Sequence, residues 1–170
     1  ACSRASSTKS VRMLVLICVS GCAISGLSDT EQSLAQRIKA GEDVDGKLTE
    51  QLLTSVSGRT GMTVLDGGKY GSNNGFDLVM QDAKGNVTII LDAKQLTQAG
   101  SVRVSTNAAG GTNQLSPDWV VRVMGSIDQN SPAAQAIKQA QFNNTLTMAV
   151  GGVNRTTGEL IVVPITVPNR

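Results

Sequence analysis

Histidine is absent from this 170-residue chain, and its absence excludes several kinds of catalytic site. A nuclease that holds its metal through histidine, a ribonuclease with two catalytic histidines and a Ser-His-Asp hydrolase all require imidazole. Any hydrolytic chemistry here must therefore depend on carboxylates, lysine and metal. Hard oxygen ligands of this kind suit Mg²⁺ or Mn²⁺ better than Zn²⁺, although carboxylates also bind zinc.

Aromatic residues are also scarce, at 2% of the chain. Proteins that bind single-stranded nucleic acid stack bases on aromatic rings, and one Trp, one Tyr and two Phe leave few rings to spare from a core. We therefore expect no recognition by base stacking. The net charge of +2 is mild for a nucleic-acid enzyme. Several scattered cations either form a phosphate-facing surface or are simply solvated. These residues are Lys69, Lys94, Arg103, Arg122, Lys138 and Arg155.

The N-terminal part has few cysteines and one short apolar stretch, residues 11–23. That stretch follows basic residues and ends in Val-Ser-Gly-Cys, as a lipoprotein signal does. Because the chain begins at Ala1, we prefer an internal helix in a fragment of a larger protein. The stretch is too short to span a bilayer. Cys2, Cys18 and Cys22 match no familiar metal or disulfide framework, and packing is their expected role.

A lysine and two acids are predicted to converge on one hairpin. The apolar run 87–91 leads into Asp92-Ala93-Lys94, where alternation along a strand places Asp92 and Lys94 on one face. The turn-like segment 82–86 would fold this run against residues 76–80 and bring Asp77 towards Asp92. Two carboxylates and a lysine suit metal-assisted phosphodiester hydrolysis. The alternative is a strand-end acid followed by an exposed lysine that only aids solubility.

A helix with a third acid precedes this hairpin. Leucines at helical spacing predict a helix over residues 46–56, on which Glu50 faces either solvent or a site. A strand at residues 63–65 and a loop rich in glycine and asparagine at residues 66–75 follow. The charged, glycine-rich stretch 39–46 is the predicted domain boundary, with an N-terminal helical extension in residues 1–45 and the main domain in residues 46–170.

In this order the motifs resemble the PD-(D/E)XK nuclease superfamily, in the form found in the C-terminal toxin domains of contact-dependent growth inhibition proteins and other polymorphic bacterial toxins. The resemblance covers residues 46–168 and depends on Glu50 and the stretches 74–77, 92–95 and 109–119. It implies a divalent-metal-dependent endonuclease, with Mg²⁺ preferred over Mn²⁺ or Zn²⁺ and no small-molecule cofactor. It also implies delivery from the cell surface as part of a larger protein, action in the target-cell cytoplasm, and a cognate immunity protein.

The resemblance assigns a role to each acid of the predicted site. Asp77 and Asp92 correspond to the metal ligands, Glu50 to the helix acid that completes the metal site, and Lys94 to the catalytic lysine. Gln95 follows the lysine and would orient water or phosphate. The family has proline before its first acid, whereas this chain has phenylalanine at position 76.

Further polar residues lie downstream of this motif. Thr112 and Gln114 are candidates for positioning substrate or water, as is Ser116, for which capping of the next helix is the preferred role. Helices are expected at residues 116–127 and 131–140, and closing strands at residues 145–150 and 160–165, with Pro164 indicating an edge. The expected fold is α/β, a mixed sheet flanked by helices with a PD-(D/E)XK nuclease-like core.

Two functions from different classes remain open. The first is an endonuclease toxin that cleaves tRNA or DNA, with tRNA favoured, and whose residues 1–45 contact the membrane transiently during delivery. The second is a non-catalytic protein-binding domain on an α/β scaffold, in which the same charges are surface features and the glycine-rich loop contacts a partner.

Overall fold

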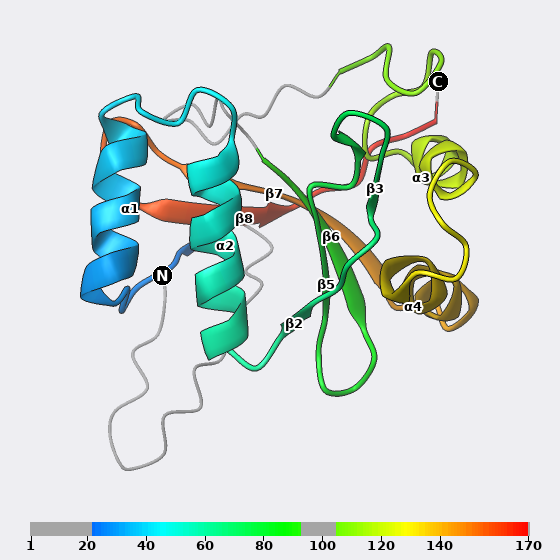
Figure 1. The fold of residues 1–170 in the computed structure, drawn as a ribbon, viewed down its shortest axis with the longest axis horizontal. Coiled ribbons are helices and arrows are strands. Elements are labelled where there is room, and N and C mark those ends of the chain that lie inside the picture. Colours follow the sequence, from blue (N-terminus) through cyan, green and yellow to red (C-terminus); the bar gives the residue numbers. More distant parts are fainter. Residues whose placement is uncertain (1–21, 93–104, 170) are drawn as a thin grey trace.

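The computed structural model describes residues 22–92 and 105–169, and of Cys22, Leu91 and Asp92 it describes the main chain alone. The chain forms a mixed sheet with helices on both faces (Figure 1). The elements in chain order are β1 (Cys22–Ala23), α1 (Asp29–Lys39), α2 (Lys47–Arg59), β2 (Thr63–Val64), β3 (Lys69–Tyr70), β4 (Asn74–Gly75), β5 (Leu78–Gln81), β6 (Val87–Asp92), α3 (Pro117–Met124), α4 (Pro132–Phe142), β7 (Leu146–Val153) and β8 (Leu160–Pro164).

The main sheet has six strands in the order β1-β8-β7-β6-β5-β2, and β3 and β4 form a separate small hairpin. The predicted hairpin of residues 76–91 is confirmed, because β5 and β6 pair antiparallel. Its turn is closed by the Asp82 side chain, which accepts hydrogen bonds from the main-chain N–H groups of Lys84 (2.8 Å) and Asn86 (2.9 Å). Strands β6 and β7 pair in parallel, and the connection between them contains α3 and α4.

Serine side chains begin three of the four helices in the described part of the chain. Ser116 and Ser131 cap α3 and α4, each with proline at the start of the helix, as the sequence predicts. Ser28 caps α1 in a capping box with Glu31. Gly46 precedes helix α2 and has no side chain to cap it, and Asp43 supplies the missing acceptors, as described below.

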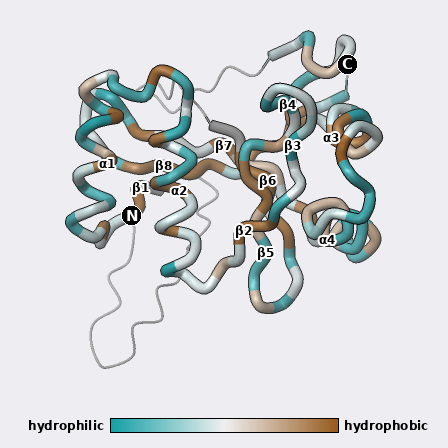
Figure 2. Tube along the Cα trace, in the orientation of Figure 1, coloured by the Kyte–Doolittle hydropathy of each residue, from teal (hydrophilic) through white to brown (hydrophobic). Residues whose placement is uncertain are grey.

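Apolar side chains form one cluster on each face of the sheet. Figure 2 shows the hydrophobic colouring concentrated along the central strands, with polar colouring in the loops. The cluster beneath α1 and α2 includes Leu34, Ile38, Leu52, Leu53, Leu78 and Ile90. The cluster beneath α3 and α4 includes Phe76, Val79, Ile89, Trp119 and Ile137. Phe76 and Trp119 meet edge to face, with ring centroids 5.2 Å apart.

Helix α1 belongs to the same apolar cluster as α2, so residues from both sides of position 45 share one core. The proposed division into residues 1–45 and 46–170 stays a prediction. Of the apolar stretch 11–23, for which the sequence predicts a helix, Cys22 and Ala23 instead form strand β1, and the rest lies outside the described residues. Each helix in residues 22–92 and 105–169 is too short or too polar to cross a bilayer. The mixed sheet and its flanking helices confirm the predicted α/β class.

Candidate active-site cavity

Glu50 and Asp77 line one cavity of about 270 Å³. Helix α2 contributes Glu50, and the start of β5 contributes Asp77 with its neighbours. The remaining wall comes from β2 and the loop that leads into β3. The complete lining is Glu50, Val64, Leu65, Asp66, Gly67, Gly68, Lys69, Phe76, Asp77, Leu78 and Val79. The structure therefore brings together two of the acids that the sequence selects.

The position of Glu50 follows from how α2 is anchored. One face of α2 buries Leu52, Leu53 and Val56 against the sheet. At its start, Asp43 is only 5% exposed and accepts hydrogen bonds from the main-chain N–H groups of Leu48 (2.9 Å) and Thr49 (3.0 Å). The Thr49 hydroxyl donates to the same carboxylate at 2.6 Å. The first turn of α2, which carries Glu50, is thus held at a fixed position.

Asp77 is held by its two neighbours, which are buried on opposite faces of the sheet. Phe76 packs in the cluster beneath α3 and α4, whereas Leu78 packs in the cluster beneath α1 and α2. The Phe76 N–H also donates to the Gly68 carbonyl at 2.8 Å. This arrangement leaves Asp77 half-buried at the cavity, where the chain enters β5.

Lys69 is a cavity residue that the sequence treats only as one of several scattered cations. Its Nζ lies 2.7 Å from Glu50 Oε1, and the two side chains are 29% and 25% exposed. A pair separated by 19 positions in sequence produces no periodic signal. The available clue is the location of Lys69 in a glycine-rich loop, whose main chain can approach other elements closely.

The loop before Lys69 is fixed against the N-terminus of α4. The Ala133 N–H donates to the Asp66 carbonyl at 3.0 Å, and the Ser131 hydroxyl donates to the Gly67 carbonyl at 3.2 Å. Gly67 has a φ of +88°, and a Cβ at this position would collide with the Ser131 side chain. Glycine is therefore required both by conformation and by close packing. This contact sets the entry of the chain into β3.

The main chain of Asp92 ends β6 and lies opposite Gly151 of β7. Gly151 is where α2 approaches the sheet, since a Cβ there would stand 3.0 Å from both methyl groups of Leu53. Leu53 is about one helical turn beyond Glu50. Gly151 thus has the main chain of Asp92 on the neighbouring strand and Leu53 of α2 packed against it. This places the main chain of Asp92 near the part of α2 that carries Glu50. Lys94 and Gln95 lie outside the described residues.

Thr112 and Gln114 hold together the loop that precedes α3. The Thr112 hydroxyl donates to the Ala108 carbonyl at 2.8 Å, and the Gln114 N–H donates to the Ser105 carbonyl at 2.8 Å. The described residues that line the cavity with Glu50 do not include either of them. Their role in positioning substrate or water stays a prediction. The preferred role of Ser116 is confirmed, because its hydroxyl caps α3 by accepting from the Trp119 N–H at 3.2 Å.

The donor atoms of the cavity suit a hard divalent cation. Glu50 and Asp77 offer carboxylate oxygens, and Mg²⁺ is commonly held by one or two carboxylates with water and substrate phosphates as the other ligands. Among the described side chains, no three acids gather closely enough to hold a metal ion without further ligands. The carboxylate of Asp92, the third expected ligand, is not among those side chains.

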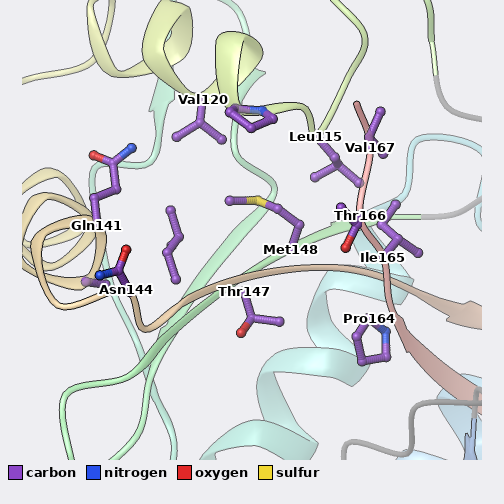
Figure 3. A pocket seen from close by; sticks show the side chains of 13 residues that line it. Leu115, Val120, Gln141, Asn144, Thr147, Met148, Pro164, Ile165, Thr166 and Val167 are labelled. Carbon is purple, nitrogen blue, oxygen red and sulfur yellow. The ribbon is translucent and has the colours of Figure 1, made fainter. Parts of the chain in front are cut away.

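A second cavity, of about 680 Å³, is lined by residues of α3, α4, β7 and the end of β8. Figure 3 shows Gln141 and Asn144 at one end, Met148 in the middle and Pro164 at the far side. The described residues that line it carry no charge. It therefore lacks the acid and lysine groups that phosphodiester hydrolysis needs, and the smaller cavity beside Glu50 is the better candidate for chemistry.

Comparisons with known proteins supply no independent assignment for this cavity. No family model, no curated protein and no solved structure matches the chain.

Proposed function

We propose that this chain is a metal-dependent endonuclease domain with a PD-(D/E)XK-like core, and that the cavity beside Glu50 is its active site. The observation that supports this most directly is that Glu50 and Asp77 line the same cavity. The resemblance predicts both as ligands of one metal. The α2 helix, the β5–β6 hairpin and the mixed sheet are compatible with such a core.

The proposal gives a role to each of five polar residues. Glu50, Asp77 and Asp92 would hold Mg²⁺, with Mn²⁺ as a substitute and Zn²⁺ as a poorer one. The bound cation would polarise the scissile phosphate and lower the pKa of a coordinated water molecule. Lys94 would orient the attacking water and offset the negative charge that develops on the phosphate. Gln95, next to Lys94, would assist in placing water or phosphate.

The biological setting follows from the resemblance to polymorphic toxin domains. In this setting the domain is delivered from the cell surface into a neighbouring bacterium and cuts nucleic acid in its cytoplasm, with tRNA favoured over DNA. Residues 1–45 would contact the membrane during delivery. A cognate immunity protein would protect the producing cell. The metal acts on phosphate rather than on a base, so the cavity chemistry is the same for either nucleic acid.

The test is to incubate the purified chain with plasmid DNA and, separately, with total tRNA in the presence of Mg²⁺, Mn²⁺, Zn²⁺ or EDTA. We expect cleavage of one substrate with Mg²⁺ or Mn²⁺ and none with EDTA. Glu50→Gln, Asp77→Asn, Asp92→Ala and Lys94→Ala should each slow cleavage by roughly 100-fold or more. Glu159→Gln, at an exposed site outside the cavity, is the matched control and should leave the rate unchanged.

Cleavage that withstands all four substitutions would show that the site has been assigned wrongly. If neither nucleic acid is cut under any of these conditions, the non-catalytic protein-binding domain becomes the better interpretation.

A further inference from the structure

The cavity has more acidic than basic residues among the described residues that line it. Glu50 and Asp77 are half-buried and Asp66 is exposed, whereas Lys69 is the one basic residue in this lining. Partly buried acids repel one another, and this repulsion is relieved by a cation between or beside them. The cavity lining therefore favours the binding of positive charge, and in the structure Lys69 supplies part of it.

The ammonium of Lys69 donates a hydrogen bond to Glu50 Oε1, an oxygen that the proposed metal site requires. Its Nζ approaches Glu50 Oε1 at 2.7 Å, so a cation that binds this oxygen must displace the ammonium or share the carboxylate with it. Two positive charges at such short range repel each other strongly in a half-buried site. Lys69 and a divalent cation are thus alternative partners of the same group.

The main chain around Lys69 is fixed, so only the side chain is free to move away. Lys69 pairs with Gly75 in the β3–β4 hairpin. Gly75 has a φ of +112°, and a Cβ there would stand 3.2 Å from the Lys69 Cα, which shows how tightly the two strands of the hairpin pack. A lysine side chain has several rotatable bonds and can swing while its Cα stays in place. Exchange at Glu50 therefore does not require the fold to open.

We propose that Lys69 is an internal competitor for the divalent cation at Glu50. In the metal-free protein its ammonium neutralises and orients the carboxylate, and a divalent cation must compete with it for that carboxylate. This inference rests on the proposed function, because it assumes that Glu50 is a metal ligand. If Lys69 competes in this way, the site binds a divalent cation more weakly than its carboxylates alone would. A singly charged cation should bind there weakly, because it would only replace one positive charge with another.

The test measures binding of Mn²⁺ alone, by calorimetry and by electron paramagnetic resonance of free Mn²⁺, without nucleic acid. Lys69→Met should bind Mn²⁺ roughly five- to tenfold more tightly than the wild type, because the competing charge is gone. Lys69→Arg keeps the charge and should stay near the wild-type affinity. Glu50→Gln should bind at least about tenfold more weakly, since it loses a ligand.

Lys47→Met is the matched control for loss of positive charge near Glu50. Lys47 begins the same helix, is 79% exposed, and pairs with Asp45 at 2.6 Å rather than with the cavity. Its removal should change Mn²⁺ affinity by less than about twofold, because solvent screens an exposed charge. Damage to the fold would weaken binding, whereas the proposal requires tighter binding by Lys69→Met, so the direction of the change separates the two.

The failure of this inference differs from the failure of the proposed function. If the wild type binds no Mn²⁺, or binds it equally well after Glu50→Gln, the metal site at Glu50 is wrong and the inference falls with it. If binding depends on Glu50 but Lys69→Met binds no more tightly than the wild type, only the competitor role is overturned. An equal gain for Lys69→Met and Lys47→Met would also overturn it.

Discussion

Arg59 Nη2 lies 2.7 Å from Glu31 Oε2, and this ion pair joins the end of α2 to the start of α1. Glu31 is 1% exposed, and its carboxylate also accepts hydrogen bonds from the Ser28 N–H at 2.8 Å and the Ser55 hydroxyl at 2.9 Å. Several donors share this buried carboxylate, so removal of its charge would leave some of them without a hydrogen-bond acceptor of the same strength. The pair therefore helps to hold the helix that carries Glu50.

Glu31→Gln should lower the free energy of unfolding by about 2 kcal/mol, because the amide cannot accept all the hydrogen bonds that the carboxylate accepts. Glu42→Gln is the control, since Glu42 pairs with Arg37 at 2.7 Å while both side chains are about half exposed. It should cost at most about 1 kcal/mol. Urea unfolding measures both, and equal losses would show that burial adds nothing to the Glu31 pair.

Stability should fall in acid partly through Glu31. Burial opposes its charged form, but the hydrogen bonds from Arg59, Ser28 and Ser55 outweigh burial and hold the pKa of Glu31 below its ordinary value of 4.5. The stabilising contribution is therefore complete above the unfolded-state pKa and is lost as the pH falls through the folded-state pKa. In urea unfolding measured from pH 7 down to about pH 3, the free energy of unfolding of the wild type should approach that of Glu31→Gln. A constant difference between the two proteins would contradict this cause.

Gly67→Ala should destabilise the protein more than Gly41→Ala. Both glycines have positive φ, of +88° and +87°, so alanine costs about 1 to 2 kcal/mol of backbone strain at either site. A Cβ at Gly41 meets nothing within 4 Å, whereas one at Gly67 meets the Ser131 side chain. We expect about 1 to 3 kcal/mol more loss at Gly67. Thermal unfolding compares the two, and similar losses would mean that the loop moves easily away from α4.

Asp43→Ala should loosen the start of α2. Asp43 is buried and accepts the N–H groups of Leu48 and Thr49, so its removal leaves these donors unsatisfied and should cost about 1 to 2 kcal/mol. Asp45→Ala, at an exposed neighbouring carboxylate, should leave stability nearly unchanged. Hydrogen exchange at the Leu48 and Thr49 amides should become faster only in the Asp43 variant, because Asp45 accepts from the Lys47 N–H instead. Unchanged exchange there would rule out the capping role.

Glu50→Gln and Asp77→Asn should not be additive in nuclease activity. If both carboxylates hold the same metal, the loss of one already removes most of the metal-dependent rate. The double variant should then be less than about tenfold slower than the slower single variant, although each single change costs roughly 100-fold. Cleavage rates at saturating Mg²⁺ provide the measurement. Multiplicative losses would indicate that the two acids act independently.

Local patterns in the sequence predict much of this fold correctly. The turn at Asp82 and the apolar runs beside it specify the β5–β6 hairpin, and the Ser-Pro pairs at the starts of α3 and α4 mark both helices. These signals are short-range, because a turn or a cap is formed by residues that are adjacent in sequence. The spacing of the leucines near Glu50 predicts its helix for the same reason.

Contacts between distant segments were not predictable in the same way. The loop at residues 66–75 contains the β3–β4 hairpin, which brings Lys69 to Glu50, and no local pattern indicates that pair. The predicted edge position of Pro164 is correct only in part. Strand β1 covers β8 at Ile161 and Val162, so β8 is an inner strand there, and Pro164 is its last residue beyond this pairing. A two-residue strand such as β1 has too few residues to show a period.

The parallel pairing of β6 with β7 also sets the order in which the chain can become functional. Val87 pairs with Leu146 and Asp92 with Gly151, so β6 keeps an open edge while the chain up to residue 145 is synthesised. Until β7 forms, Leu53 of α2 also cannot pack against Gly151. A growing chain thus contains Glu50, Asp77 and Asp92 before it has the complete sheet that positions them. We expect the proposed hydrolytic activity to arise only after β7 has been synthesised and has paired with β6.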